Sequence, residues 1–407
     1  MSVASAYRES FERLASEVPQ NEREARRRLF DAFSALGLPG RELEDWRYTD
    51  LSALSQIGFA PASSSCAPPE HPDLAGVDRV VYVNGHLDCA RTTQPALHGG
   101  RLDMATADDG IVALNGAFGH EGLALALAAN ARLTRPLHVV LAGCAGEVPV
   151  MCHQQHRIEL GEGAEAAVLL DFRGSAGAER LATHRFEIRL GRSAQLRLYR
   201  IQDEAAGANL VTRIDATLDR DSRLLAACFD RGAGLARHDF NVTLAAPGAE
   251  VGLDGLYAPR ARAHVDNHTR IVHACERGRS REHFRGIVDE RARAVFNGKI
   301  VVQPGAQKTD SEQRVANLLL SPRAEVDAKP ELEIYADDVK CAHGATVGQL
   351  DARALDYLRS RGLDAATARA LLLRAFAAAI VDRVEWRELR ERVAGVFGLP
   401  ADEVAEA

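Results

Sequence analysis

The sequence lacks the features that mark several common classes of protein. Its seven cysteines are scattered and odd in number, and no two of them form a Cys-x-x-Cys pair. A private cysteine-rich metal site is therefore not expected, and we expect most of these side chains to be buried as small apolar groups. No uninterrupted apolar stretch of roughly 18 residues occurs, so the sequence predicts no transmembrane helix.

Positive charge is also scarce relative to negative charge. The 50 lysines and arginines stand against 57 aspartates and glutamates, a formal net charge of −7, which argues against broad nucleic-acid binding. The N-terminal residues contain no hydrophobic signal region, so a cytoplasmic protein without a membrane partner is expected. At 407 residues the chain is too long for one compact core of ordinary size.

Signatures of several enzyme families are missing as well. The sequence contains no Gly-x-Ser-x-Gly elbow, no His-Glu-x-x-His helix and no glycine-rich dinucleotide loop. Residues 305–309 (Gly-Ala-Gln-Lys-Thr) resemble a phosphate loop, but Gln307 and Val302 stand where a Walker A loop needs glycine. We interpret this segment as a turn and expect no ATP site in this chain.

The first third of the chain mixes helical and extended patterns. Helical spacing of apolar residues predicts helices over residues 4–17 and 22–36, and a stretch rich in proline, serine and alanine at 61–72 is typical of a linker. Asn84-Gly85 between apolar runs predicts a hairpin, followed by a helix over 110–133 and a strand over 137–141. We interpret residues 1–75 as a helical region with linker and 76–149 as a mixed α/β lead-in.

From about residue 150 the chain shows a degenerate repeat. Related turn segments begin at Leu160, Leu190, Leu218 and Ala245, separated by 30, 28 and 27 residues, and later relatives begin at residues 302 and 320. Strands with period-2 alternation lie between them, as at residues 184–190. Such a period indicates a solenoid whose coils bury their apolar faces against their neighbours. A mainly β protein is predicted, with a parallel β-helix or stacked β-sandwich over residues 150–350.

The last part of the chain, residues 351–407, is again predicted to be helical. Asp351 and Asp364 are suitable N-caps for helices over residues 352–361 and 365–384, with Gly362 ending the first. A further helix is expected over residues 385–397. The helix over 365–384 is apolar nearly all round, so it should be covered by this chain or by a partner.

A thiol and an imidazole lie close together in the tripeptide Cys341-Ala342-His343. In an extended strand residues i and i+2 point to one face, so sulfur and nitrogen donors suited to iron, zinc or copper would lie side by side. Two donors are half of a closed site, and a partner subunit could supply the rest. The alternative is a buried cysteine and a hydrogen-bonded histidine that only pack. Asp337 and Asp338 are possible further ligands, although such residues are more common in turns.

Four more histidines occur within residues 264–283, at positions His264, His268, His273 and His283. Their spacings of 4, 5 and 10 fit neither a helical metal site nor a strand ladder. We favour polar interface or hydrogen-bonded solenoid positions over metal binding.

Residues 296–351 resemble the SufD proteins of iron–sulfur cluster assembly, through the successive segments QKTDS, ANLLLSP, DAKPELEIYADDVKC and HGAT. Residues 44–49 (EDWRYT) resemble the N-terminal signature of the same family, and the resemblance covers most of the chain. It implies a right-handed parallel β-helix between helical ends. The sister family SufB is longer and has an N-terminal cysteine cluster, which this chain lacks, so SufD is favoured.

The resemblance also implies a function, that of a non-catalytic scaffold subunit. SufD proteins pair with SufB, bind the ATPase SufC, and carry nascent clusters. By resemblance His343, with Cys341 beside it, lies at the SufB–SufD interface and helps to hold a transient iron–sulfur cluster shared with the partner. When isolated, the chain could pair with a second copy of itself. The SufC-like ATPase would dock on the C-terminal helices, at Leu363, Ala365, Ala368, Leu371, Leu372 and Phe376.

Two other functions stay open at this point. The first is a β-helix metalloenzyme or hydrolase, which needs a full set of catalytic groups in one cleft of a single chain and should turn over substrate alone. The second is a purely structural adaptor in which Cys341 and His343 only pack. Cluster formation that survives substitution of both residues would favour the adaptor.

Overall fold

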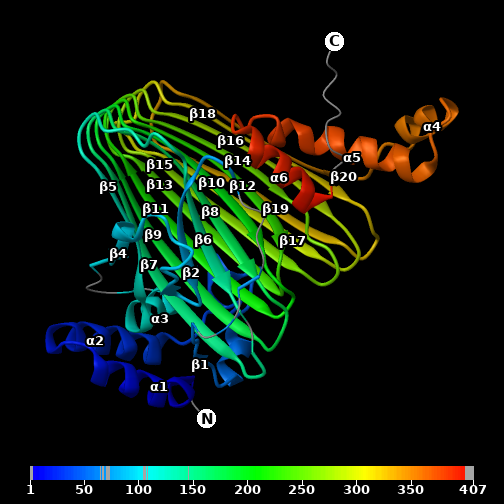
Figure 1. Cartoon of the computed structure of the whole chain (residues 1–407). Helices are drawn as coiled ribbons and strands as arrows, with labels where there is room; N and C mark the ends of the chain where they lie inside the picture. The colour runs from blue at the N-terminus through cyan, green and yellow to red at the C-terminus, as the bar shows by residue number, and fades with distance from the viewer. Residues whose placement is uncertain are drawn as a thin grey trace.

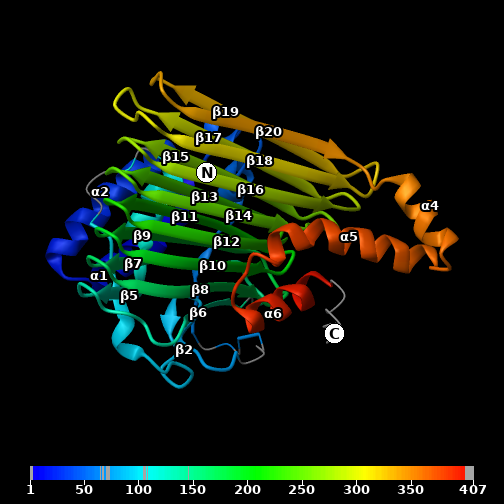
Figure 2. The ribbon, with the colours of Figure 1, turned by 90° about the horizontal axis from the view of Figure 1, so that it is seen from above.

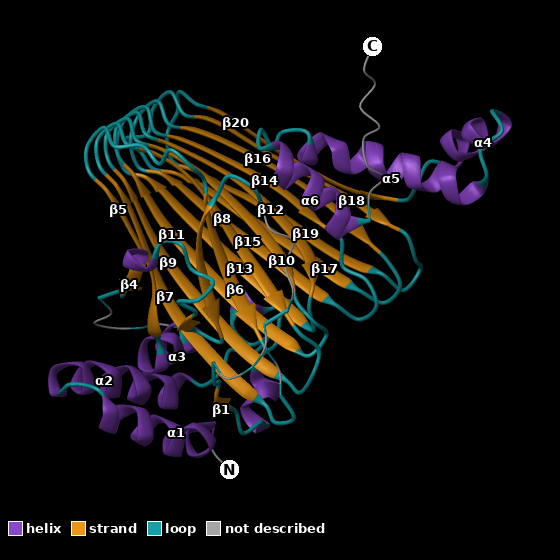
Figure 3. Cartoon of the chain, in the orientation of Figure 1, coloured by secondary structure: helices purple, strands orange, loops and turns teal. Residues whose placement is uncertain are grey.

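The computed structural model describes residues 3–64, 66, 68–69, 74–103, 107, 109–144 and 146–398. Its core is a parallel β-solenoid, in which successive strands are placed alternately in two facing sheets (Figure 1). Helices lie at the two ends of the chain (Figure 3). The predicted β-helix is therefore confirmed, and the alternative of a stacked β-sandwich is wrong because the strands along each stack pair in parallel.

The two sheets contain the strands in the following spatial order. Sheet A consists of β19 (Glu325–Ile334), β17 (Arg293–Val302), β15 (His264–His273), β13 (Leu235–Leu244), β11 (Ala208–Leu218), β9 (Arg180–Leu190), β7 (Val150–Leu160), β5 (His120–Leu127) and β4 (His98–Gly100), with β1 (Ala60–Pro61) paired to β7. Sheet B consists of β20 (Lys340–Gly348), β18 (Asp310–Leu319), β16 (Arg279–Val288), β14 (Glu250–Tyr257), β12 (Arg223–Gly232), β10 (Gln195–Asp203), β8 (Glu165–Gly174), β6 (Leu137–Gly143), β2 (Asp78–Val83) and β3 (His86–Leu87).

The helices agree with the predicted helical ends. They are α1 (Val3–Glu17), α2 (Gln20–Leu36), α3 (Gly110–Phe118), α4 (Ala352–Ser360), α5 (Ala365–Val381) and α6 (Arg387–Phe397), with short 3-10 turns η1 (Glu44–Trp46), η2 (Ser52–Gln56) and η3 (Pro95–Leu97). No helix in the described part of the chain is long and apolar enough to cross a membrane.

The helix predicted over residues 110–133 was wrong beyond Phe118, where strand β5 begins at His120. The segment reads HEGLALAL, and its alternate leucines Leu123 and Leu125 are buried in the core between the sheets. Alanine and leucine favour helix in isolation, but pairing with β7 and burial of one face outweigh that preference.

The predicted turn repeat is confirmed by a column of turns along one edge of the solenoid. Gly163, Ser193, Asp221 and Gly248 occupy equivalent positions with φ between 55° and 76°. Each donates its backbone N–H to a carbonyl in the next coil, with N···O distances of 2.8–3.3 Å. Because only the backbone conformation is common to these positions, glycine, serine and aspartate can replace one another there.

The repeat also contains two turns that the sequence pattern missed and one that it misplaced. Asn130 has φ 60° and donates its N–H to Glu162, so it precedes Gly163 in the column. Arg277 has φ 58° and donates its N–H to Gln307, so residues 274–278 belong to the same column. The segment that begins at Leu320 connects β18 to β19, whereas the others connect sheet A strands to sheet B strands. It therefore lies on the opposite edge, and its likeness to the column is one of turn chemistry alone.

Helices cover the outer faces of the two sheets at different places. Helices α1, α2 and α3 form an apolar cluster with outward side chains of sheet A such as Leu181 and Val211. The second half of α5 and helix α6 pack against outward side chains of sheet B such as Tyr199 and Phe229. Helix α4 and the first half of α5 extend away from the solenoid (Figures 1 and 2).

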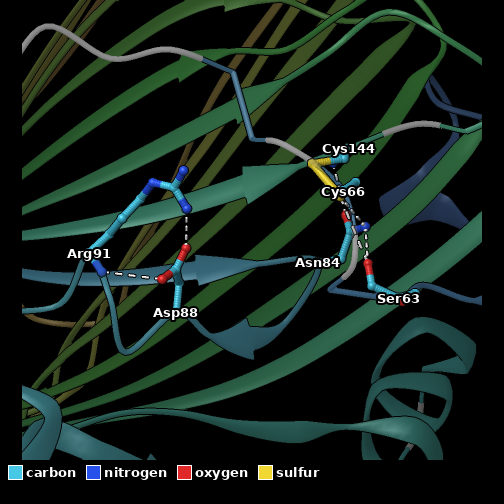
Figure 4. Close-up of a disulfide and its surroundings, with 6 residues drawn as sticks. All are labelled: Ser63, Cys66, Asn84, Asp88, Arg91 and Cys144. Atoms are coloured by element: carbon cyan, nitrogen blue, oxygen red, sulfur yellow. Dashed lines mark hydrogen bonds and ion pairs between the residues drawn. A yellow bond between two sulfur atoms is a disulfide. The ribbon is translucent and has the colours of Figure 1, made fainter.

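The cysteines depart from the sequence-based expectation. Among the seven, all of which the structure describes, Cys144, Cys152 and Cys228 are buried, so the expectation that most would be buried was wrong. Cys144 forms a disulfide with Cys66, which lies in the predicted linker (Figure 4). Asn84 of the hairpin links the two segments that the disulfide joins. Its side-chain amide donates to the Ser63 carbonyl and accepts from the Cys144 backbone N–H. Residues 65, 67 and 70–72 of that linker fall outside the described ranges.

Candidate functional site

The candidate site lies at the last coil of the solenoid, where β19 and β20 end the two sheets (Figure 2). No strand among the described residues pairs with the outer edge of either strand. Side chains of this coil are correspondingly more exposed than those of earlier coils. Large apolar side chains are among them, with Ile334, Tyr335 and Val347 exposed by 41%, 61% and 50%.

Cys341 and His343 both lie on β20 and share one face. Cys341 pairs in register with Ser311 and packs against the core between the sheets, so its side chain points inward. His343, two residues on, is in register with Gln313 and points to the same side. It is exposed because no further coil covers it, and no hydrogen bond or ion pair within the described residues involves its ring.

The electrostatic setting distinguishes the two donors. Burial raises the pKa of the Cys341 thiol, and the nearby Asp310 carboxylate raises it further. The thiol form is therefore favoured at neutral pH, whereas a metal ligand must be a thiolate. A neutral imidazole, in contrast, presents a lone pair without carrying a negative charge.

The chain does not complete a metal site around this pair. Within the described residues no group of three or more histidine, cysteine or acidic side chains is arranged to hold a metal ion. Asp338 serves the turn column instead, because its carbonyl accepts from the Lys308 amide and its carboxylate pairs with the Lys308 ammonium group. Asp337 and Asp338 are both exposed in that turn. Any further ligand to Cys341 and His343 would come from outside the described chain.

The pair continues two columns of polar side chains, whose members in the two preceding coils are buried. One column is Ser280, Ser311 and Cys341, and the other is Glu282, Gln313 and His343, in the register of β16, β18 and β20. The Gln313 amide donates to the Glu282 carboxylate at 2.6 Å, and the two serine hydroxyls are 2.7 Å apart. Sequence reasoning missed these residues, although each stands 30 or 31 positions from the next in its column, close to the repeat period.

The four histidines of residues 264–283 do not form a metal cluster. His264 and His268 flank Asp266 on the face of sheet A where the EDWRYT segment docks. The Thr49 hydroxyl donates to Asp266 at 2.5 Å and lies 2.9 Å from His264 Nε2, while His268 pairs with Asp266 at 3.0 Å. Burial lowers the pKa of His264 to about 4, so a neutral ring is favoured there.

The remaining two histidines serve other contacts. His273 faces the Ser280 hydroxyl at 2.9 Å inside the solenoid. His283 lies on the outer face of sheet B, beside Asp254 and Arg383 of the segment that follows α5. The interpretation as hydrogen-bonded solenoid residues is therefore confirmed for His264, His268 and His273, whereas a role at an interface with another chain stays a prediction.

The segment that resembles a phosphate loop is one of the solenoid turns. Lys308 occupies the left-handed position of the turn column with φ 62°, and the Thr309 hydroxyl donates to the Ala306 carbonyl at 2.8 Å. A phosphate loop leads from a strand into a helix, whereas residues 303–309 lead from β17 into β18. The interpretation as a turn is confirmed.

Helix α5 divides into a covered half and a projecting half. Its end packs on sheet B through Ala377, Ile380 and Val381. Near its middle, the Arg285 guanidinium donates to the Phe376 carbonyl at 2.6 Å and lies 4.7 Å from the Phe376 ring. The apolar surface of α5 was predicted to need cover, and sheet B of this chain covers the second half of the helix.

The predicted docking residues differ in how far they are exposed. Ala368 is fully buried, so it cannot be part of an exposed surface. Leu363, Leu372 and Phe376 are half-buried, and Ala365 is exposed. Leu371 is exposed by 38%, as is Tyr357 of α4 by 58%.

A cavity of about 430 Å³ lies between α5 and the free end of sheet B. His283, Gln313, His343, Ile380 and Arg383 are among the residues that border it. The predicted cluster residue and the C-terminal helix therefore adjoin the same hollow, although they come from different parts of the chain.

Comparison with known proteins finds a family model and several relatives that match this chain. Residues 142–376 match the family model described as SUF system FeS cluster assembly, SufBD core domain. The chain is 32% identical over 378 residues to the iron–sulfur cluster assembly protein SufD of Escherichia coli, covering 89% of each chain. A SufBD family protein of Synechocystis is 30% identical over 396 residues, covering 89% of this chain and 87% of that one. A SufBD family protein of Mycobacterium leprae is 27% identical over 379 residues, covering 90% and 92%.

Proposed function

This chain belongs to the SufBD family of the SUF system for iron–sulfur cluster assembly, and from that premise we propose that it is a non-catalytic scaffold subunit. In this proposal it forms a cluster site jointly with a SufB-like partner. The observation that carries the proposal is the position of Cys341 and His343 at the uncovered last coil. There a second subunit can supply the missing ligands.

The free strand edges support a partner at this end. The outer edges of β19 and β20 offer backbone N–H and C=O groups that another strand can pair with. The exposed side chains of Ile334, Tyr335 and Val347 add apolar surface beside those edges. A SufB-like subunit, whose family resemblance implies the same solenoid, would present a matching edge, and in its absence a second copy of this chain would do so.

The cluster itself is cargo that the scaffold binds and releases. Two donors from this chain and the rest from the partner give a site that opens when the subunits move apart. Such a shared site suits transfer better than a closed set of ligands from one chain, because its opening needs no unfolding. We assign the first donor to His343, because it is exposed at the uncovered coil, whereas Cys341 packs against the core between the sheets.

The ATPase of the complex is proposed to dock on the projecting hairpin of α4 and α5. Tyr357 and Leu371 are exposed there, and exposed apolar side chains on a projecting element are typical of a protein interface. ATP hydrolysis would then belong to that SufC-like partner. Purified, partner-free protein should show no ATPase activity, because the segment around Lys308 is built as a turn.

The decisive experiment is anaerobic cluster reconstitution on the assembled complex with His343→Ala. We expect the variant to fold and to bind its partners, with a loss of stability of about 1 kcal/mol, while iron and sulfide content falls severely. Thr346→Ala, on the opposite face of the same strand, is the matched control and should load normally. Equal loading in His343→Ala would reject the ligand role and favour a structural adaptor.

A further inference from the structure

We propose that Gln313 and Glu282 are positioning residues for His343, a hydrogen-bonded pair that fixes the imidazole from below and leaves one ring nitrogen free for the cluster. The inference rests on the proposed function, because it concerns the same site. It assigns roles to two residues in the interior of the solenoid that the donor pair alone does not require.

The first support is the register of three neighbouring strands. Glu282 pairs with Gln313, and Gln313 pairs with His343, so the three residues occupy one column on the inner face of β16, β18 and β20. Adjacent strands lie about 4.8 Å apart. The Gln313 side chain therefore lies one strand away from that of His343 in the same column.

The second support is an unused hydrogen-bond acceptor on the Gln313 side chain. Its side-chain amide donates to the Glu282 carboxylate at 2.6 Å, which fixes which end of the amide faces Glu282. Gln313 Oε1 is left buried without a hydrogen-bond partner in the described part of the chain. A buried acceptor without a donor is costly, and a ring N–H of His343 is the donor that the next coil can supply.

The third support is the space that the opposite sheet leaves for Gln313. A Cβ atom at Gly298 of β17 would come within 2.2 Å of Gln313 Nε2. The glycine thus makes room for an extended glutamine that crosses the interior toward it. A substitution of Gly298 would displace the Gln313 amide, so Glu282 and Gly298 together fix the position of this side chain.

The neighbouring column differs in a way that singles out Gln313. There His273, Ser280 and Ser311 form a continuous chain at 2.9 and 2.7 Å, and Ser311 lies one coil below Cys341. The hydroxyl oxygens of this chain already have partners. Within the described residues, Gln313 has an unused acceptor one coil below His343, whereas the hydroxyl below Cys341 already has a partner.

The consequence for His343 is a defined tautomer. A ring N–H that donates to Gln313 Oε1 leaves the lone pair of the other nitrogen directed away, toward the uncovered end. Partners of this kind hold a metal-binding histidine in orientation, and their loss typically weakens metal binding 10- to 100-fold. We expect a loss of cluster retention on that scale when the acceptor of Gln313 is removed.

The test measures the tautomer without any cluster. In the full chain labelled with ¹⁵N-histidine, the His343 ring signals are assigned by their absence in His343→Ala. They are then compared between wild type and Gln313→Met at a pH where the ring is neutral. We expect one dominant tautomer in the wild type and a mixture in the variant. Gln313→Glu, which shares a proton with Glu282 and keeps an acceptor oxygen, should restore the wild-type pattern.

The matched control is Asn317→Leu, a buried residue on the same strand and face that accepts from Tyr257. A wild-type tautomer in Gln313→Met, or an equal change in Asn317→Leu, would overturn the inference. The second readout is the release of the cluster from the assembled complex to a chelator, and the rate of release should rise about 10-fold for Gln313→Met. Normal loading of His343→Ala rejects the proposed function, whereas its loss together with an unaltered tautomer in Gln313→Met rejects this inference alone.

Discussion

At the scale of single residues, burial inside the solenoid shifts the pKa of the Glu282 carboxyl. Glu282 is fully buried, and burial raises its pKa from 4.5 to about 7. Between pH 4.5 and about pH 7, the Glu282 carboxyl is therefore protonated to a greater extent in the folded state than in the unfolded state. By linkage, the free energy of unfolding should fall as pH rises from about 4.5 to 7, because the carboxylate is formed at a cost in the interior.

Glu282→Gln should remove this dependence. The variant cannot ionise at this position, so above pH 7 it should be more stable than the wild type by up to about 3 kcal/mol, the equivalent of the pKa shift. Below pH 4.5 the two proteins should be similar. Denaturant titrations of both proteins across this range provide the measurement, and parallel pH profiles would contradict the assignment of the shift to Glu282.

At the scale of elements, helix α6 and the second half of α5 belong to the solenoid rather than to a separate body. Arg392 of α6 contacts Asp171 of β8 at 2.5 Å, and Asp171 is also bound by His138 at 2.7 Å and by Arg173 at 2.8 Å. Burial alone would raise the pKa of Asp171, but His138 and Arg173 outweigh it and hold the pKa below its ordinary value. Deleting residues 363–407 would leave the ion pair between Arg173 and Asp171 in place. It would also expose the apolar outer face of sheet B that α5 and α6 cover.

Point substitutions on the projecting hairpin are therefore the cleaner test of ATPase docking. Leu371→Glu and Tyr357→Asp each place a charge at a position that is exposed in this chain. The free energy of unfolding should therefore change by about 0.5 kcal/mol or less. Binding of the SufC-like ATPase should weaken at least 10-fold. Arg387→Ala, an exposed residue of α6 away from the hairpin, is the control, and undiminished binding of both hairpin variants would reject the docking site.

At the scale of the whole molecule, the two ends of the solenoid differ. At the first end the short strands β3 and β4 pair antiparallel with β2 and β5, whereas the last coil ends in the free edges of the long strands β19 and β20. Because each coil depends on its neighbours for burial, an uncovered coil is the natural place for another subunit to join.

Tyr335→Asp combined with Val347→Glu should disrupt that joining while the chain stays folded. Both side chains are at least half exposed, so the charges cost little in the monomer but would be buried without a counterion in the complex. We expect pairing with the SufB-like subunit to weaken 10-fold or more, measured by co-purification and sedimentation. His343→Ala should retain pairing, and retention of the complex by the double variant would place the interface elsewhere.

The sequence by itself determined the strand alternation, the repeat of nearly 30 residues, the helical ends and the shared face of Cys341 and His343. All of these depend on residues close together in the chain, where backbone geometry imposes periods of 2 and 3.6. The turn at residues 305–309 also follows from the sequence, because Val302 and Gln307 stand where a phosphate loop needs glycine.

Only the tertiary structure decided which residues stand above one another. The column of Glu282, Gln313 and His343 depends on the register between coils, and register depends on turns whose lengths vary, so a pattern of roughly 30 residues cannot fix it to one position. The strand at β5, the Cys66–Cys144 disulfide and the division of α5 into covered and projecting halves depend equally on contacts between distant segments. Local propensity carries no information about such contacts, because burial is decided by whichever part of the chain arrives to cover a side chain.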